Sequence, residues 1–182
     1  VLISEYLISK PIIMYKFIVI ALFIFCSSLA FGWGATGHRV VGLVAQKYLS
    51  KNAKRNIQRL LGYESMAMAS NWMDEIRSDS TYDYTTDWHW VTIPDGMTYD
   101  QSQKNPKGDI IQTIERLITE LKSKKLTPTQ ELVHFKMLIH LIGDIHQPLH
   151  AGRGEDFGGN TLKVTWHRAE TNLHTVWDSD MI

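Results

Sequence analysis

Cysteine is nearly absent from this 182-residue chain, which contains only Cys26. A single cysteine cannot form a disulfide within the chain, and it excludes the zinc sites that are built from several cysteines. Any zinc site in this protein would therefore have to use histidines and carboxylates. The chain has eight histidines and 19 acidic residues from which such a site could be built.

The chain also lacks a net charge, because 19 basic residues balance 19 acidic ones. Residues 33–182 alone contain 17 basic and 18 acidic residues, since Glu5, Lys10 and Lys16 lie upstream. The summed charge therefore gives no electrostatic indication of a nucleic-acid or membrane partner. Repeats, low-complexity segments and linkers are missing from this span as well, which predicts one domain with a sizeable core.

Long hydrophobic runs are limited to residues 17–26, and that run is short for a membrane span. Lys16 precedes it, and residues 30–32 follow as a small-x-small cleavage pattern. A positive start, an apolar run and a small-residue cleavage site are typical of a secretory signal peptide, which we predict over residues 14–32. A membrane anchor is the alternative interpretation.

Cleavage after Gly32 would leave Trp33 as the mature amino terminus and would remove the cysteine. We expect translation to start at Met14, with residues 1–13 as upstream sequence, because the chain does not begin with Met. The mature protein, residues 33–182, is then expected to be secreted or periplasmic and free of any membrane attachment.

Apolar residues recur at helical spacing through most of the mature chain, so the predicted fold is mainly α. Ser50 and Asp109 are expected to cap helices, and Gly62 is expected to end one. Thr127 and Gln130 form a capping-box pattern around a proline at the first helical position. Residues 81–106 predict a loop around a short extended segment, and glycine-rich turns flank a short hairpin that includes residues 162–166. The expected helices cover residues 38–49, 50–62, 65–77, 109–121 and 127–145, with a last helix starting near Thr171.

The stretch from His140 to His150, read HLIGDIHQPLH, carries the strongest local signal. His140 and Asp144 are four residues apart, so they share one face of a helix that is apolar nearly all round. Pro148 ends that helix, which lets His150 fold back to the same end. Two imidazoles and a carboxylate can bind zinc, and a buried carboxylate is unfavourable unless it is paired or bound to metal. A buried polar pair is the alternative for this stretch alone.

His174 and Asp178 repeat the same His-x-x-x-Asp spacing on the last expected helix. Further polar candidates have ordinary alternative roles. His38 could lie on a helix surface, Asp74 could pair with the arginine one turn on, and His89 could pack between two tryptophans. Taken together, the candidates are harder to explain as ordinary residues, because they occur in nearly every segment. They are Trp33, His38, Asp74, His89, His140, Asp144, His150, His174 and Asp178.

Six motifs within residues 33–182 resemble those of a known enzyme family: WGATGH, NWMDEIR, WHW, HLIGDIHQPLH, DFGGN and NLHTVWD. They are similar to motifs of the zinc-dependent single-strand nucleases and 3′-nucleotidases of the S1/P1 type, which are distant relatives of bacterial zinc phospholipase C. The resemblance implies a single mainly α domain with a small β-hairpin and three zinc ions in a cleft. Family members continue for several more helices, so we expect the carboxyl-terminal part to be missing after Ile182.

The resemblance also implies a ligand set for each zinc ion. The first zinc would be bound by Asp74, His89, His140 and Asp144. The second would be bound by His150, His174 and Asp178. The third would be bound by the amine and carbonyl of Trp33, by His38 and again by Asp144, so that Asp144 bridges two ions.

Through the same resemblance we expect hydrolysis of single-stranded DNA and RNA to 5′-phosphate products, with 3′-nucleotides as further substrates, by a monomer. Asp74, Arg77 and Asp144 are the expected catalytic positions, with Arg77 holding a phosphate oxygen. Trp90 would stack on a base, with core packing as the alternative. Two other functions remain open: a zinc phospholipase C acting through the same metals, and a non-catalytic zinc-binding protein.

Overall fold

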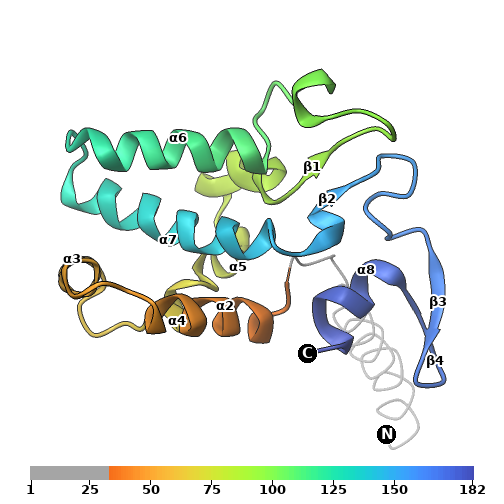
Figure 1. Cartoon of the computed structure of the whole chain (residues 1–182), viewed down its shortest axis with the longest axis horizontal. Coiled ribbons are helices and arrows are strands. Elements are labelled where there is room, and N and C mark those ends of the chain that lie inside the picture. The colour runs from red at the N-terminus through yellow and green to blue at the C-terminus, as the bar shows by residue number, and fades with distance from the viewer. Residues whose placement is uncertain (1–32) are drawn as a thin grey trace, which may run out of the picture. The chain divides into compact units, whose positions relative to one another are not determined.

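A computed structural model describes residues 33–182 of the chain (Figure 1). The predicted signal peptide at residues 14–32, the start at Met14 and the cleavage after Gly32 involve residues that lie outside the described part. Within that part, none of the helices combines the length and the apolar character that crossing a membrane requires.

One helix, α7, lies at the centre of the fold and contacts most of the others (Figure 1). Helix α6 runs along one side of α7, and α2, α3 and α4 lie along the other. The mainly α architecture expected from the sequence is confirmed. The helices are α2 (Ala35–Lys47), α3 (Lys51–Leu61), α4 (Met66–Ala69), α5 (Trp72–Glu75), α6 (Ile110–Ser123) and α7 (Pro128–Asp144).

The capping residues set the helix ends where the sequence predicts them. The Ser50 hydroxyl accepts from the Ala53 amide at the start of α3, and Gly62, with φ of 62°, ends that helix. Asp109 caps α6 through its carboxylate. At α7 the hydroxyl of Thr127 accepts from the backbone amide of Gln130, whose side chain reaches back to the Thr127 amide. These contacts satisfy amides that the first turn of a helix leaves unpaired.

The single helix expected over residues 65–77 is wrong, because the chain is interrupted there. It forms α4, then α5, then a 3₁₀ turn, η1 (Ile76–Ser78). At the break the Ser70 hydroxyl donates to the Ala67 carbonyl, while the Ser70 carbonyl accepts from His140 Nδ1 at 2.7 Å. Side-chain and long-range hydrogen bonds therefore compete with the helical pattern at this point.

The loop expected over residues 81–106 is wrong in its first part, which is a 3₁₀ helix, η2 (Ser80–His89). Asp79 caps it by accepting from the Thr81 amide, and the Thr85 hydroxyl donates to the carbonyl three residues earlier. Such short-range bonds favour tight turns without apolar periodicity, which is why the pattern of the sequence does not reveal this helix. A second 3₁₀ turn, η3 (Tyr99–Gln101), follows later in the same segment.

Two small sheets complete the described fold. Strand β1 (Val91–Thr92) pairs in parallel with β2 (Ala151–Gly152), which follows the 3₁₀ turn η4 (Pro148–His150). Strand β3 (Lys163–Trp166) pairs antiparallel with β4 (Ala169–Asn172), which confirms the predicted hairpin. The last helical segment begins later than Thr171, because Asn172 caps it. It consists of α8 (Leu173–Thr175) and the π-helical η5 (Val176–Asp180).

Apolar side chains pack on both sides of α7. Between α7, α6 and η2 the buried cluster includes Leu117, Met137 and Leu141. Between α7, α3 and α4 a second cluster includes Met66 and Ile139. Packing on two sides fixes the axial position of α7, and with it the polar residues at the last turn of the helix.

Candidate metal centre

The last turn of α7 places His140 and Asp144 together, as the spacing of four predicts. Both side chains are fully buried, and His140 Nε2 lies 3.1 Å from Asp144 Oδ2. His89, at the end of η2, adds its Nδ1 atom 2.8 Å from the same carboxylate oxygen and 3.1 Å from His140 Nε2. Polar groups from α7 and from η2, more than 50 residues apart in the sequence, therefore converge on one point inside the protein.

His38 and Asp74 extend this cluster. His38 Nε2 lies 3.2 Å from Asp144 Oδ1, and its ring stacks on His140 with centroids 3.9 Å apart. Asp74 Oδ1 lies 3.7 Å from His140 Nε2. The close approach of His38 depends on Gly143, because a Cβ atom at that position would lie 2.7 Å from His38 Nδ1.

A second group lies beside the first and consists of His150, His174 and Asp178. His174 Nε2 is 3.0 Å from Asp178 Oδ2, and His150 Nε2 is 3.9 Å from Asp178 Oδ1. His150 Nδ1 is also 3.4 Å from Asp144 Oδ1, which links the two groups. The parallel pairing of β1 with β2 helps to fix His150, which directly precedes β2.

The backbone fixes which ring nitrogen of two histidines carries a hydrogen. His140 Nδ1 donates to the Ser70 carbonyl and His174 Nδ1 donates to the Gly158 carbonyl, both at 2.7 Å. In a neutral imidazole the other nitrogen, Nε2, then presents a lone pair. Each Nε2 atom faces a carboxylate oxygen that also presents lone pairs. Only a proton or a metal ion between the two atoms makes such a pair favourable. Backbone carbonyls that accept from the other ring nitrogen, as at Ser70 and Gly158, are the usual means of orienting metal-binding histidines.

Several buried polar atoms of the cluster have no hydrogen-bond partner among residues 33–182. They belong to His38, His89, Asp144 and His150. A buried polar atom without a hydrogen-bond partner destabilises the folded protein, so these nitrogen and oxygen atoms are suited to bind a metal ion, which accepts lone pairs. Among the residues that the structure describes, three sets of three side chains have ligand atoms that lie within 4.8 Å of one another. These are His38 with His140 and Asp144, Asp74 with His89 and His140, and His150 with His174 and Asp178.

Comparison with known proteins agrees with this geometry. A profile of the family described as S1/P1 Nuclease matches residues 33–182. The chain belongs to the S1/P1 nuclease family.

Three relatives illustrate the similarity. Endonuclease 3 of Arabidopsis thaliana is 35% identical, covering 82% of this chain and 54% of its own length. Nuclease S1 of Aspergillus oryzae is 30% identical, covering 85% of this chain and 56% of its own length. Nuclease P1 of Penicillium citrinum is 31% identical, with 82% and 58% covered. The chain thus spans little more than half the length of the curated relatives it matches.

Only the set of His150, His174 and Asp178 has the same members as an expected ligand set. The other two overlap with the expected sets, because His140 lies within reach of both His38 and Asp74. Of the expected ligands, the structure brings all the histidines and aspartates together. Trp33 lies at the start of the described chain, and the amide of the next residue, Gly34, donates to the backbone carbonyl of Asp178 at 2.7 Å. The backbone next to Trp33 is therefore anchored beside the second group, whereas the role of its amine as a ligand stays a prediction.

Charge and burial shift the pKa values within the cluster. Burial lowers the pKa of His89 and of His150, which favours the neutral imidazole that a metal needs. Burial opposes ionisation of Asp144 too, but the neighbouring imidazoles outweigh it and hold the pKa of that carboxyl well below its usual range. The same attraction outweighs burial at His140, whose pKa is raised. The lowered pKa of Asp144 favours its ionised form in this buried site.

Arg77 and Trp90, the expected substrate-binding residues, lie at the surface near these groups. Arg77 Nε is 3.2 Å from Asp74 Oδ1, as the spacing of three predicts, and its side chain is 30% exposed. Trp90 directly follows His89 and is 41% exposed, so the alternative of core packing is wrong. An arginine and an exposed aromatic ring on the solvent side of a buried anion-rich cluster are suited to contact a phosphate and a base.

Sequence reasoning missed Gln147, which is fully buried. Its amide nitrogen donates to Asp178 Oδ1, and its amide oxygen accepts from the Leu149 amide. Gln147 thereby orients the carboxylate of the second group and supports the turn that carries His150. A polar residue between two predicted ligands, followed by a proline, was the available signal. The carbonyls of Ser70 and Gly158, which orient His140 and His174, could not be found from residue type.

The central position of Asp144 generates a test. Asp144→Asn removes the carboxylate charge that His38, His89 and His140 all approach. Because this carboxylate is expected to bind two ions, we expect the variant to lose more than one zinc equivalent. Asp178→Asn is the matched control, because Asp178 belongs only to the second group, and it should lose one equivalent. Zinc counting by mass spectrometry of the purified variants measures both. Loss of one zinc or none from Asp144→Asn would contradict the shared position of this residue.

Proposed function

We propose that the chain is the zinc-binding part of a secreted, monomeric nuclease that hydrolyses single-stranded DNA and RNA. The observation that carries this proposal is the convergence of three buried His and Asp sets around Asp144 in a member of the S1/P1 nuclease family. Relatives named Nuclease S1 and Nuclease P1 support the reaction class.

Nitrogen and carboxylate ligands without cysteine suit zinc in a hydrolytic site. We propose that Asp74, His89, His140 and Asp144 hold one ion, that His150, His174 and Asp178 hold a second, and that His38, Asp144 and Trp33 hold a third. Zinc at these positions would supply Lewis-acid stabilisation of a phosphoryl group and lower the pKa of a bound water.

The residues around the ligands define how substrate would be held. Arg77, kept in place by Asp74 at 3.2 Å, can donate to a phosphate oxygen from the exposed side of the cluster. Trp90 offers an exposed ring for stacking on a base. A ring that stacks on one base face and an arginine on the adjacent phosphate require an unpaired, flexible nucleotide. This requirement is why we propose single strands as the substrate.

The proposed reaction is hydrolysis, in which a water oxygen bonds to phosphorus, the bond from phosphorus to the 3′-oxygen breaks, and the 3′-oxygen leaves as a hydroxyl after taking up a proton. It yields 5′-phosphorylated products from a strand, and it releases phosphate from a 3′-nucleotide. A test is to incubate the zinc-loaded protein with single-stranded DNA, a 3′-nucleotide and phosphatidylcholine, and then to analyse the product ends. We expect 5′-phosphate ends and free phosphate, with the lipid unchanged. Cleavage of the lipid alone would favour a phospholipase C, and zinc binding without any hydrolysis would favour a non-catalytic protein.

Arg77 provides a prediction about catalysis. Arg77→Ala removes the donor to the phosphate while leaving every proposed ligand in place, so zinc content should stay at the wild-type value. Turnover of single-stranded DNA should fall by about 10²-fold, the usual effect of losing one donor to a developing charge. Arg77→Lys should recover part of the rate, because it keeps the charge but not the fork of donors. Unchanged turnover in Arg77→Ala would remove this residue from the mechanism.

The amino terminus provides another prediction. We propose that signal cleavage after Gly32 frees the Trp33 amine, because a neutral amide nitrogen is a poor ligand and an amine must be deprotonated to bind. The unperturbed pKa of an α-amino group is about 7.7–8.0, so a free amine can deprotonate near neutral pH. A protein that starts at Trp33 should bind one zinc more than a protein carrying an added Gly-Ser. Equal zinc content and equal hydrolysis in the two proteins would exclude this maturation step.

A further inference from the structure

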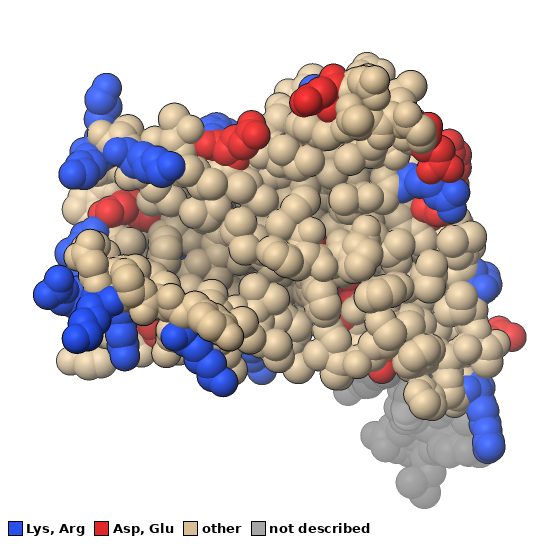
Figure 2. Space-filling view, in the orientation of Figure 1, with Lys and Arg blue, Asp and Glu red and all other residues tan. Residues whose placement is uncertain are grey.

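Positive charge gathers on helix α3, away from the candidate metal centre. Between Lys47 and Tyr63 the sequence has no acidic residue, although the whole chain is neutral. Figure 2 shows the resulting concentration of Lys and Arg at the end of the molecule where Figure 1 places α3. We call Lys51, Lys54 and Arg55, which are all exposed, the α3 basic surface.

These three cations are not needed to hold the fold together. Within residues 33–182, none of the three forms an ion pair, whereas Arg59 at the other end of α3 pairs with Glu131 at 2.8 Å. Lys51 and Lys54 stand in the first turn of α3, which contains no acidic residue. Helix dipoles favour acidic side chains there, so the cations weaken the helix slightly. Because the described residues leave these cations without an ion pair, they are available to an external anion, and cations at this density attract polyanions.

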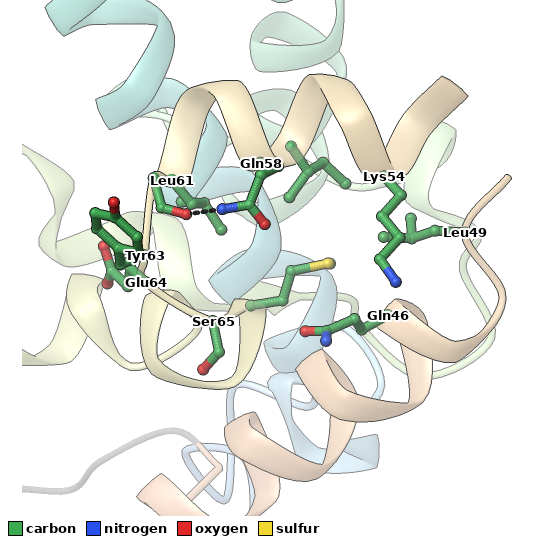
Figure 3. A pocket seen from close by; sticks show the side chains of 11 residues that line it. Gln46, Leu49, Lys54, Gln58, Leu61, Tyr63, Glu64 and Ser65 are labelled. Atoms are coloured by element: carbon green, nitrogen blue, oxygen red, sulfur yellow. Dashed lines mark hydrogen bonds between the residues drawn. The ribbon is translucent and has the colours of Figure 1, made fainter. Parts of the chain in front are cut away.

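A pocket of about 190 Å³ opens next to this surface (Figure 3). Its lining includes the apolar side chains of Leu49, Ile57 and Met66. Lys54 stands on one side of it, and Tyr63, which is fully exposed, stands on the opposite side (Figure 3). The volume is below the ~300 Å³ of sites for drug-sized ligands, so it suits a single planar ring system. The pocket is thus suited to the base of an unpaired nucleotide, with the phosphates of the strand lying against the cations.

We propose that the α3 basic surface and this pocket bind a segment of single-stranded nucleic acid outside the metal centre. The phosphates lie along Lys51, Lys54 and Arg55, and a base stacks on Tyr63 or enters the pocket. The inference rests on the proposed nuclease function, which it extends from the cleaved bond to the rest of the strand. Its consequence is that long strands bind more tightly than short ones at the same catalytic site.

The geometry sets the length at which this advantage begins. Arg59 of α3 pairs with Glu131 in the first turn of α7, while Asp144 lies in the last turn of that helix. Thirteen residues of helix separate the two, which corresponds to about 20 Å. At about 3.4 Å per stacked nucleotide, roughly six nucleotides cover the distance from Asp144 to the end of α7 that contacts α3, and an extended strand covers it with fewer. A dinucleotide can therefore occupy the metal centre but cannot reach the α3 basic surface at the same time.

The test compares two variants that each remove one lysine and one arginine from the zinc-loaded protein. Lys54→Gln with Arg55→Gln alters the α3 basic surface, and Lys163→Gln with Arg168→Gln alters the β3–β4 hairpin as the matched control. KM is measured for a 20-nucleotide single strand and for a dinucleotide. The first variant should raise KM for the 20-mer about tenfold near 0.2 M salt and leave the dinucleotide unchanged. The hairpin variant should behave like the wild type with both substrates.

Binding gives a second measurement that does not depend on hydrolysis. A phosphorothioate 20-mer keeps the charge of a strand and resists cleavage, so its affinity can be measured against salt by fluorescence anisotropy. Losing two phosphate contacts should flatten the slope of log affinity against log salt by about 1.4. The same slope in both variants and the wild type would overturn the proposal, and so would an equal loss in both variants.

The two proposals fail in different ways. If the wild type hydrolyses neither substrate but its phosphorothioate binding depends on Lys54 and Arg55, the nuclease function fails and the surface stands. If the wild type cleaves both substrates and the α3 variant lowers kcat/KM for the dinucleotide as much as for the 20-mer, the surface is overturned. In that case these residues act on the metal centre rather than on a distant part of the strand.

Discussion

The buried carboxylate of Asp144 is the charge around which the described structure is arranged. It lies at the carboxyl end of α7, where the helix dipole is also negative, and its side chain is fully buried. His38, His89, His140 and His150 all place a ring nitrogen within 3.4 Å of its oxygens. An unpaired charge in such a place would be strongly destabilising, so the groups that neutralise it have to be brought in from distant parts of the chain.

That requirement explains several departures from regular structure. The break at Ser70 frees a carbonyl to hold His140, and the 3₁₀ helix η2 ends at His89. Gly143 provides the room in which His38 stacks on His140. Regular helices alone would place such groups at multiples of a turn, whereas metal ligands have to converge on points. The site therefore combines residues of regular helices, which are His38, His140 and Asp144, with residues such as His89 and His150 that 3₁₀ segments bring in.

The sequence predicted the features that depend on neighbouring residues, such as helix ends, and could not predict contacts between residues far apart in the chain. Helix ends at Ser50, Asp109 and Thr127 follow from capping chemistry within four residues of the chain, and the structure has them. The pairing of His38 with Asp144 spans more than a hundred residues and has no local pattern. It was expected only through the resemblance to a family. Gln147 escaped notice because its importance lies in what its amide contacts, and a residue type does not reveal contacts.

The net charge of the chain also says less than the positions of its charged residues. The balance of 19 basic and 19 acidic residues gave no indication of an anionic partner, yet the cations are not spread evenly. A run without acidic residues places Lys51, Lys54 and Arg55 on one helix, while Asp74, Asp144 and Asp178 are drawn into the candidate metal centre. Carboxylates that bind metal no longer repel phosphate, so the sum overstates the negative charge a strand would meet. A neutral total is therefore compatible with a surface that attracts nucleic acid, because the partner meets local fields rather than the total.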